Sequence, residues 1–461
     1  MQRDTSMDNV TTSPFRGASS PAAQQDLPEN GAALKRSGAG PGIGNIRWTV
    51  CAMLFAATSI NYIDRQVLGI LAPVLQHTIG WTDLQYSYIV SGFQFAYALG
   101  LILAGLMVDK LGTRIGYAII MGVWSLSAMS HALASTVIEF ATARFFLGLG
   151  ESGNFPAAVK ATAEWFPQRE RALATGIFNA GTSVGPILAP ALVPWVALRF
   201  GWQAAFLMTG LFSMIWIVVW LLFYRTPAKH RRVGAAEFAY INSDREEPTK
   251  AIPLRSLLTY RQTWAFAAGK FLTDPVWWFF LFWLPLFLTR RFHLSLGQLT
   301  LPLIVVYNVS AVGSVGGGWL PGWLNRRGMA MTRARIATML LCACLVTPIF
   351  FVSRAPSQWV SIGLISVAVA AHQGWSANLF TTVSDMFPRA AVGSVVGIGA
   401  TMGSLGGVLF SLGTGWVLHV THSYSPLFVI SALAYLLALG VMQWLAPGFR
   451  AKTITLPTGQ E

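Results

Sequence analysis

Apolar segments of about twenty residues recur along most of this chain, and a helix of that length crosses the ~30 Å hydrocarbon core of a bilayer. Only 11% of the 461 residues are charged, against about a quarter in soluble domains. The sequence has no alternating ten-residue strand pattern, which excludes a membrane barrel. It therefore predicts an all-α membrane protein with twelve transmembrane helices, at residues 48–75, 83–107, 114–133, 137–160, 171–197, 203–224, 262–289, 298–322, 335–353, 358–382, 391–418 and 424–446.

Lysine and arginine residues predict the orientation of these helices. The two tails and the loops after even-numbered segments hold 25 of the 32 Lys and Arg residues. The opposite side holds only Arg199, Arg290, Arg291 and Arg354. Because positively charged loops stay in the cytoplasm, we expect both termini there. The net charge of +14 is thus an orientation signal and does not indicate a nucleic-acid partner.

A long polar segment divides the chain into two related halves. The segments FPQRERALATGIFNAGTSVG (166–185) and FPRAAVGSVVGIGATMGSLG (387–406) share Phe-Pro, Gly-Ile and a final Gly at one offset of 221 residues. Duplicated halves with a site near the middle of the membrane are typical of secondary transporters. The predicted parts are a disordered cytoplasmic tail (1–46), a six-helix half (47–224), a cytoplasmic linker (225–261), a second six-helix half (262–446) and a cytoplasmic C-terminal tail (447–461).

Charged residues inside the first predicted segment are functional candidates, because a charge in lipid is costly. Asp64 and Arg65 are adjacent there. Neighbours on a helix point about 100° apart and do not face each other. Arg65 offers a planar fork that suits a carboxylate, so we expect it to bind an anionic substrate. A structural ion pair between Asp64 and Arg65 is the alternative.

Two further pairs of charges lie in predicted segments. Arg144 and Glu151 are seven residues apart and share a helix face. We expect Glu151 to carry a proton and Arg144 to act on Asp64 or Glu151 rather than on the substrate. Lys270 and Asp274 are spaced i, i+4, which indicates a structural pair, with Lys270 as a second anion contact as the alternative.

Polar and aromatic residues in the segments are candidates for binding hydroxyl groups and a sugar ring. The alternative for each is that it joins two membrane helices. In the aromatic run 276–283, packing or lipid contact is the favoured interpretation, and a sugar contact by Trp277 or Trp278 is the alternative. His372 stands 221 residues after Glu151, at the matching position of the second half. The candidates are Asn61, Tyr62, Asn179, Thr182, His372, Gln373, Trp375 and Asn378.

The segment GLMVDKLGTR (105–114) resembles the loop signature of the major facilitator superfamily. The resemblance implies a conformational latch formed by Gly105, Asp109, Gly112 and Arg114, with Asp109 holding the outward-open state. The matching segment GGGWLPGWLNRRG (316–328) lacks the Asp, so no second latch is expected there.

Within that superfamily, NYIDRQVLGILAP (61–73) and RFFLGLGESGNFPAAVKATAEWFP (144–167) resemble the anion:cation symporters. YRQTWAFAAGKFLTDPVWWFFLFWLPLFL (260–288) and AAHQGWSANLFTTVSDMFPRAAVGSVVGIG (370–399) are similar to hexuronate transporters. The resemblance implies proton-coupled uptake of galacturonate or glucuronate across a bacterial inner membrane. It also implies that Tyr97 binds substrate and that Asp64 and Glu151 take part in proton coupling.

We therefore expect a monomeric sugar-acid importer that works by alternating access, with protons as coupling ions and no cofactor or metal. Its expected partners are a small organic anion and membrane lipid. One alternative is a transporter or exchanger of another organic anion, such as an aldonate or an aromatic acid. Another is a membrane receptor or sensor that does not transport. An enzyme is not expected, because the sequence shows no nucleophile–base constellation.

Overall fold

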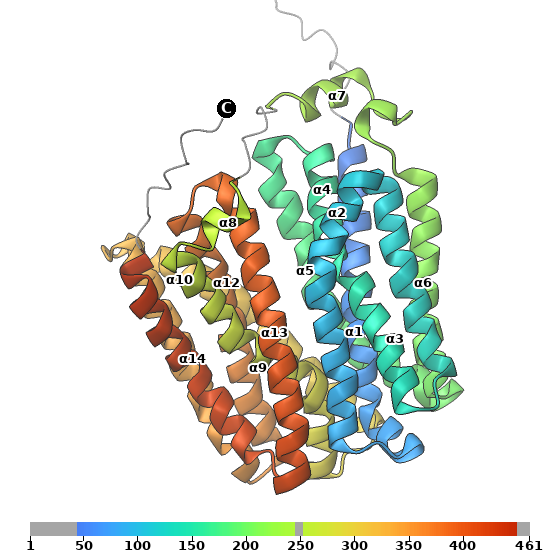
Figure 1. Cartoon of the computed structure of the whole chain (residues 1–461), viewed down its shortest axis with the longest axis vertical. Helices are drawn as coiled ribbons and strands as arrows, with labels where there is room; N and C mark the ends of the chain where they lie inside the picture. The colour runs from blue at the N-terminus through green and yellow to red at the C-terminus, as the bar shows by residue number, and fades with distance from the viewer. Residues whose placement is uncertain (1–43, 245–251, 450–461) are drawn as a thin grey trace, which may run out of the picture. The chain divides into compact units, whose positions relative to one another are not determined.

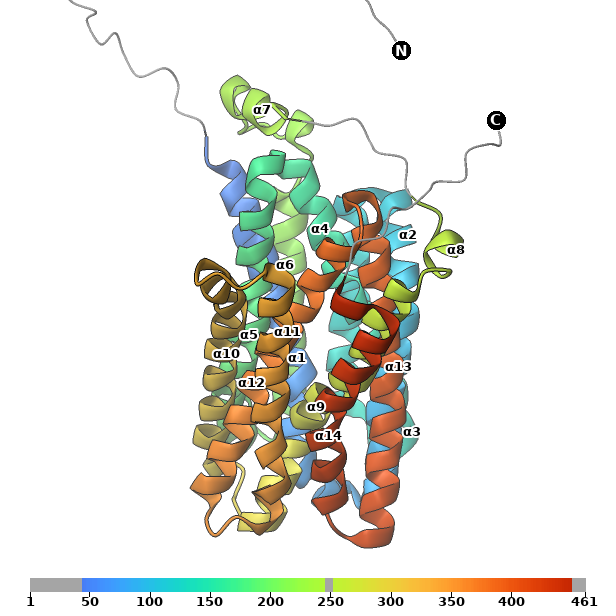
Figure 2. The same ribbon diagram turned by 90° about the vertical axis from the view of Figure 1, so that its left-hand side faces the viewer.

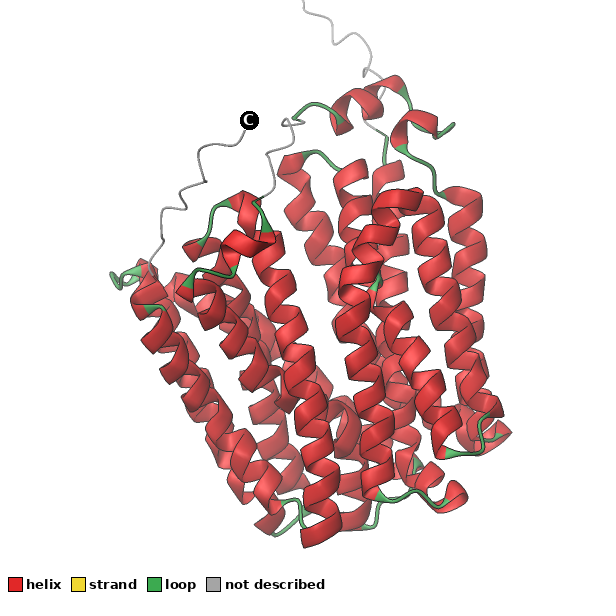
Figure 3. Ribbon diagram, viewed as in Figure 1, coloured by secondary structure: helices red, strands yellow, loops and turns green. Residues whose placement is uncertain are grey.

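The computed structural model describes residues 44–244 and 252–449, and these residues are helical with no strand among them (Figures 1 and 3). Most of the predicted tails, 1–46 and 447–461, lies outside the described residues. The α-helices are α1 (Ile46–Ile79), α2 (Asp83–Ser130), α3 (Val137–Ser152), α4 (Asn154–Trp165), α5 (Gln168–Phe200), α6 (Trp202–Phe223), α7 (Ala235–Ile241), α8 (Leu254–Leu257), α9 (Arg261–Phe292), α10 (Thr300–Arg326), α11 (Met331–Val346), α12 (Gln358–Met386), α13 (Arg389–Thr421) and α14 (Ser425–Leu445). Short 3₁₀ turns are η1 (His131–Leu133), η2 (Pro227–Lys229), η3 (Gly297–Leu299), η4 (Thr347–Arg354) and η5 (Pro447–Phe449).

These helices account for the predicted membrane segments. Within the described residues, ten helices are long and apolar enough to cross a membrane. Helix α2 carries the second and third predicted segments, joined at Gly112, where φ is +74° and ψ is 159°. This left-handed backbone favours glycine, which explains the residue at this turn. Helices α3 and α4 share the fourth segment and meet at Gly153, two residues after Glu151.

The two halves of the chain repeat the same architecture, as the sequence offset predicts. Helices α5 and α13 are both 33 residues long, and they begin and end at positions 221 residues apart. In the first half α1 packs on α5 and α2 on α3, and in the second half the equivalent helices pack in the same way, α9 on α13 and α10 on α12. The halves meet where α2 lies beside α13, α5 beside α10 and α1 beside α9 (Figures 1 and 2).

The end of the bundle where α1 begins is called the inner end, and the end where α1 stops is called the outer end. These names follow the orientation predicted from the Lys and Arg residues.

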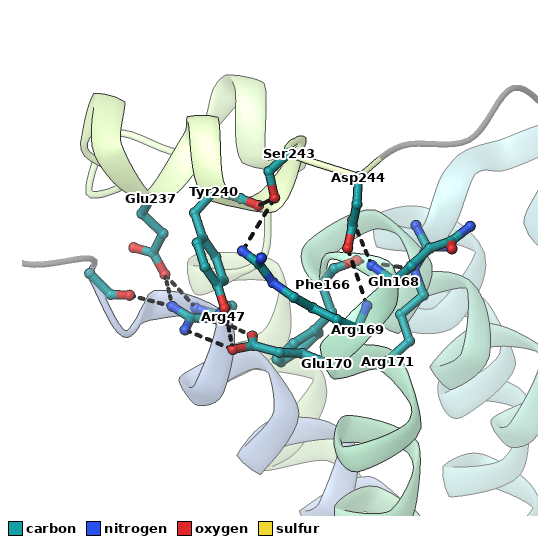
Figure 4. A network of polar contacts seen from close by, with 11 residues as sticks. Arg47, Phe166, Gln168, Arg169, Glu170, Arg171, Glu237, Tyr240, Ser243 and Asp244 are labelled. Carbon is teal, nitrogen blue, oxygen red and sulfur yellow. Dashed lines mark hydrogen bonds and ion pairs between the residues drawn. The ribbon is translucent and has the colours of Figure 1, made fainter.

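The predicted linker contains a helix, α7, that docks on the inner end of the first half (Figure 4). Arg47 Nε lies 2.9 Å from Glu170 Oε2, and the backbone N–H of Arg47 donates to Glu237 Oε1 at 3.1 Å. The Tyr240 hydroxyl donates to Glu170 Oε1 at 2.7 Å. Since Arg47 belongs to α1, Glu170 to α5 and both Glu237 and Tyr240 to α7, these contacts bind three helices together.

Asp244, which follows α7, caps the start of α5. Asp244 accepts hydrogen bonds from the backbone N–H groups of Gln168 at 2.7 Å and Arg169 at 3.2 Å, at the start of α5 (Figure 4). A carboxylate is favoured there by the unpaired N–H groups of the helix. Desolvation opposes the charge of Asp244, but these hydrogen bonds and the nearby Arg169 and Arg171 outweigh it and lower the pKa of its carboxyl group.

Candidate functional site

The adjacent charges of α1 point to different neighbours. Asp64 Oδ2 accepts hydrogen bonds from Trp124 Nε1 at 2.6 Å and from Ser213 Oγ at 3.3 Å, on α2 and α6. Arg65 points instead to α3, where its Nε lies 3.0 Å from Glu151 Oε2. Both side chains are buried. Asp64 and Arg65 therefore form no ion pair with each other, and each has its own environment.

Arg65 and Glu151 form an ion pair in the interior of the first half. The side chains of Arg65 and Glu151 are 3% and 0% exposed. Arg65 Nη2 also donates to Asn61 Oδ1 at 3.2 Å, and Asn61 Nδ2 donates to the carbonyl of Glu151 at 3.3 Å. Within the described residues, Arg65 Nη1 and Glu151 Oε1 make no hydrogen bond. One nitrogen of the guanidinium fork thus remains available for a further acceptor.

Four aromatic rings surround the guanidinium of Arg65, and we call them the aromatic cage. The distances from Arg65 Cζ to the ring centroids are 4.7 Å for Tyr62, 4.9 Å for Tyr97, 5.1 Å for Trp278 and 5.5 Å for Phe93. All lie within the range of a cation–π contact. Because Trp278 belongs to α9, the cage joins the two halves around one cation.

Arg144 lies against the backbone of Arg65. Its Nη2 donates to the carbonyl of Arg65 at 3.3 Å, and its guanidinium faces the rings of Phe93 and Phe282. The side chain is buried, and its Nε and Nη1 have no hydrogen-bond partner in the part of the chain that the structure describes. Arg144 is thus placed to hold the α1 backbone at Arg65.

The second half contributes another ion pair, in which Lys270 is buried and Asp274 is partly buried. Lys270 Nζ lies 2.6 Å from Asp274 Oδ2, one turn further along α9. The ammonium also lies 4.5 Å from the ring centroid of Phe380 on α12. The i, i+4 pair expected from the sequence is therefore formed.

The candidate residues on α12 lie in two environments. His372 Nδ1 lies 2.6 Å from the Tyr435 hydroxyl, and the His372 ring stacks on Trp277. Gln373 is partly buried. Asn378 Nδ2 donates to the carbonyls of Gly317 at 2.7 Å and Gly374 at 2.8 Å, which places it between α12 and α10. Trp375 is buried with its ring edge toward Tyr435 on α14.

The candidates on α5 lie at the edge of the first half. Asn179 is exposed and Thr182 is partly buried. The neighbouring Gly181 lets α5 approach α1 closely, because a Cβ atom there would lie 2.7 Å from the carbonyl oxygen of Phe55. The structure therefore brings Asn61, Tyr62, Tyr97 and Glu151 together around Arg65. Among the described residues, no hydrogen bond or ring contact joins this group to Asn179, Thr182, Trp375 or Asn378.

Several residues of this site were not predicted as binding residues. Phe93 completes the aromatic cage, and Trp124 and Ser213 bind Asp64. In the sequence each is an apolar or small residue within an apolar helix, which is also the composition of ordinary packing. Trp278 is the alternative sugar contact in the sequence. It stands four residues after Asp274, which places both side chains on the same face of one helix. Among the described residues no group of three or more His, Cys, Asp or Glu side chains is placed to hold a metal ion.

A model of the Major Facilitator Superfamily matches residues 54–411 of the chain. The chain belongs to this superfamily. It is therefore a multi-pass membrane transporter and not an enzyme. Two solved structures of superfamily members have the same fold: the xylose transporter XylE from E. coli in an inward open conformation (TM-score 0.68, 14% identity, 89% of this chain and 98% of that chain), and a D-xylose-proton symporter (TM-score 0.70, 16% identity, 88% and 99%).

Three curated relatives from this superfamily are named for sugar acids. The hexuronate transporter of Escherichia coli K12 is 33% identical over 401 residues, covering 86% of this chain and 93% of the relative. The galacturonate transporter of Dickeya chrysanthemi is 34% identical over 284 residues, covering 60% and 82%. The probable galactarate/D-glucarate transporter GudP of Bacillus subtilis is 29% identical over 426 residues, covering 86% and 92%.

The superfamily loop signature lies between the two arms of α2. Asp109 Oδ1 lies 2.8 Å from Lys160 Nζ of α4, in the same half. Arg114 Nη2 donates to the carbonyl of Leu221 on α6 at 2.5 Å. Gly112 forms the turn, and Gly105 lies one turn before Asp109 on α2. Among the described residues, the ion pair of Asp109 and the hydrogen bond of Arg114 therefore both stay within the first half.

An ion pair and hydrogen bonds join the two halves toward the outer end. Arg290 of α9 forms a two-pronged ion pair with Asp83 of α2, at 2.6 and 2.9 Å. The Tyr86 hydroxyl donates to the Phe282 carbonyl at 2.8 Å, and Ser411 Oγ donates to Gln94 Oε1 at 2.9 Å. These hydrogen bonds hold the two halves together at the outer end.

We predict that Arg290→Gln weakens this closure. The Arg290 side chain is 40% exposed, and exposed ion pairs contribute about 0.2–1 kcal/mol, so we expect the outer end to open up to about five times more often. The probe is Ser91→Cys at the buried α2–α13 contact, in a protein whose three native cysteines are replaced, labelled with a membrane-impermeant thiol reagent. Arg291→Gln, one residue along, is the matched control. Equal labelling of the two variants would exclude Asp83–Arg290 as a closing contact.

Proposed function

We propose that this carrier imports a hexuronate, such as galacturonate or glucuronate, by proton symport with alternating access. The similarity to the E. coli hexuronate transporter, at 33% identity over 86% of the chain, supports a sugar acid as substrate. The observation that carries the proposal is the Arg65–Glu151 ion pair inside the aromatic cage.

The chemistry of the cage suits an anionic sugar. The guanidinium of Arg65 can bind a carboxylate through two parallel hydrogen bonds. The faces of Tyr62, Tyr97 and Trp278 offer apolar surface for a sugar ring, and the Asn61 amide offers both a donor and an acceptor for hydroxyl groups. Lys270, Gln373 and His372 are proposed contacts for the distal hydroxyls.

Glu151 supplies the proposed coupling between proton and substrate. While Glu151 is ionised, it occupies the guanidinium that the substrate carboxylate needs. Protonation removes its charge, and Arg65 can then accept the substrate instead. Asp64 is the second proposed proton site, in its separate pocket of Trp124 and Ser213. Arg144 holds the backbone of Arg65 during the exchange.

The proposed cycle moves the two halves against each other around this site. Opening toward the outside breaks the Asp83–Arg290 contacts, and the signature residue Asp109 then stabilises that state. Release of substrate and proton to the cytoplasm resets the carrier. We propose that it acts as a monomer in the bacterial inner membrane with both termini in the cytoplasm.

Uptake into proteoliposomes tests this function. We expect labelled galacturonate or glucuronate to accumulate above its equilibrium level when the outside is made acidic, because proton entry drives the substrate inward. A protonophore should abolish that accumulation while leaving exchange at equal pH intact. Uptake that ignores the pH gradient would contradict proton symport. Transport of galactonate or an aromatic acid in place of both hexuronates would instead identify another organic anion as substrate.

A further inference from the structure

The second half places a cation–carboxylate pair along the face of α9 that borders the aromatic cage. Trp278, Asp274 and Lys270 are spaced at four-residue intervals and therefore lie along one face of the helix. With a rise of 1.5 Å per residue, Asp274 lies about 6 Å and Lys270 about 12 Å from Trp278 along the helix axis. Tyr62 of the cage interacts electrostatically with both Arg65 and Asp274. The Lys270–Asp274 pair therefore lies one to two helical turns from the cage along α9.

Asp274 neutralises the charge of Lys270. Asp274 Oδ2 lies 2.6 Å from its Nζ, and the two side chains are 18% and 7% exposed, respectively. Helix α13 passes close to the carboxylate at Gly403, where any Cβ atom would overlap Asp274 Oδ2, so this position leaves room only for glycine. A substrate arriving at this end meets a neutral pair and not a free cation.

This pairing bears on which sugar acids fit. A hexuronate has one carboxylate and ends in an aldehyde or ring hydroxyl groups, whereas an aldarate has a carboxylate at each end. A second carboxylate needs its own cation, and leaving it beside Asp274 places like charges together, which costs several kcal/mol. Arg144 is another buried cation, but its guanidinium lies against the backbone of Arg65. It is therefore not placed to pair with a second carboxylate.

We propose that Asp274 is a specificity-determining residue that restricts this carrier to monocarboxylic sugar acids by neutralising Lys270 and repelling a second carboxylate. This inference rests on the proposed function, since it assumes that Arg65 binds the first carboxylate. Hydroxyl groups at the far end of a monoacid can donate to Asp274 and accept from Lys270 without disturbing the pair.

Inhibition of labelled galacturonate exchange by unlabelled galacturonate and galactarate tests the proposal. Exchange at equal pH is used because it needs no proton gradient. We expect wild type to prefer galacturonate over galactarate at least about tenfold, as like-charge repulsion requires. Asp274→Asn keeps the shape of the side chain and an acceptor oxygen for Lys270. We expect it to reduce the preference for galacturonate at least about tenfold. Asp274→Glu, which keeps the charge, is the matched control and should retain it.

A second variant and a binding measurement keep the proposal testable if Asp274→Asn does not transport. Asp274→Ser removes the same charge with a smaller side chain, and the rise in unfolding temperature with each acid reports binding by purified protein that does not transport. Adding Lys270→Gln to Asp274→Asn should abolish the improved binding of galactarate, because the cation freed by Asp274→Asn is then removed. A wild type that binds both acids equally, or charge-removing variants that keep the wild-type preference, would overturn the proposal. Failure of wild type to exchange any hexuronate would instead overturn the proposed function.

Discussion

Galacturonate uptake is expected to fall at least about a hundredfold when Arg65 is replaced by alanine. The substitution removes the cation at the centre of the aromatic cage and leaves Glu151 buried without its partner. Breaking a buried ion pair costs about 3–5 kcal/mol, and each 1.4 kcal/mol is about tenfold in an equilibrium constant. The measurement is the initial rate of uptake into proteoliposomes, normalised to the amount of folded protein recovered. Arg199→Ala removes an exposed arginine from the outer end of α5 and should leave the rate within about twofold of wild type, as is usual for surface changes.

The double variant Arg65→Ala/Glu151→Gln separates substrate binding from charge balance. If Arg65 serves only to neutralise Glu151, then removing both charges should restore exchange of galacturonate. If Arg65 binds the carboxylate, the double variant should stay inactive. Arg65→Lys keeps the charge but loses the planar fork, so it should recover part of the binding at most. Restored exchange in the double variant would rule out Arg65 as the anion site.

Much of the fold follows from physical constraints that are visible in the sequence. A bilayer requires apolar helices of about twenty residues, because backbone groups in lipid must pair within the segment. The constant offset between Phe166 and Phe387 predicted the repeated halves, and α5 and α13 have the same length at that offset. The merging of two segments into α2 and the break at Gly153 were not predicted, because local glycine geometry decides them.

The charged part of the site was visible in the sequence for the same reason. A buried Arg or Glu in a membrane helix is too costly to be incidental, so Arg65 and Glu151 stood out. Their pairing at 3.0 Å joins α1 to α3, a tertiary contact that no local spacing encodes. Phe93 and Trp124 resemble packing residues in sequence and gain their roles only from the side chains that they meet. Asn378, by contrast, was a polar candidate that the structure places in the contact between α10 and α12.

The proposed exchange of carboxylate partners at Arg65 would couple proton binding to substrate binding. One guanidinium faces Glu151 in the structure, and the proposed substrate is a competing carboxylate. Two carboxylates cannot both be ionised beside one buried cation without an uncompensated charge. In the proposed mechanism, proton binding to Glu151 and substrate binding to Arg65 therefore favour each other. This reciprocity is a coupling free energy between two sites, and it requires a side chain at position 151 that can change its charge.

Glu151→Gln is expected to remove proton-driven accumulation while preserving exchange. The amide keeps an oxygen that can accept from Arg65 Nε, so the local geometry is retained, but the side chain carries no charge at any pH. Arg65 is then always available to substrate, and equal-pH exchange should stay within about tenfold of wild type. An inward pH gradient should give no accumulation above equilibrium. The assay loads proteoliposomes with unlabelled galacturonate for exchange, and imposes an acidic exterior on empty ones for accumulation.

The matched control for that variant is Glu164→Gln, which removes a carboxylate on α4 that bonds Thr113 at 2.6 Å and Tyr224 at 2.5 Å, away from Arg65. Because it leaves the Arg65–Glu151 pair intact, it should still accumulate substrate when the gradient is imposed. Asp64→Asn distinguishes the two proposed proton sites. If its accumulation persists while that of Glu151→Gln is lost, then Glu151 alone couples the proton to transport. Full accumulation by Glu151→Gln would remove this residue from the coupling mechanism, and with it the argument that one guanidinium is exchanged between two carboxylates.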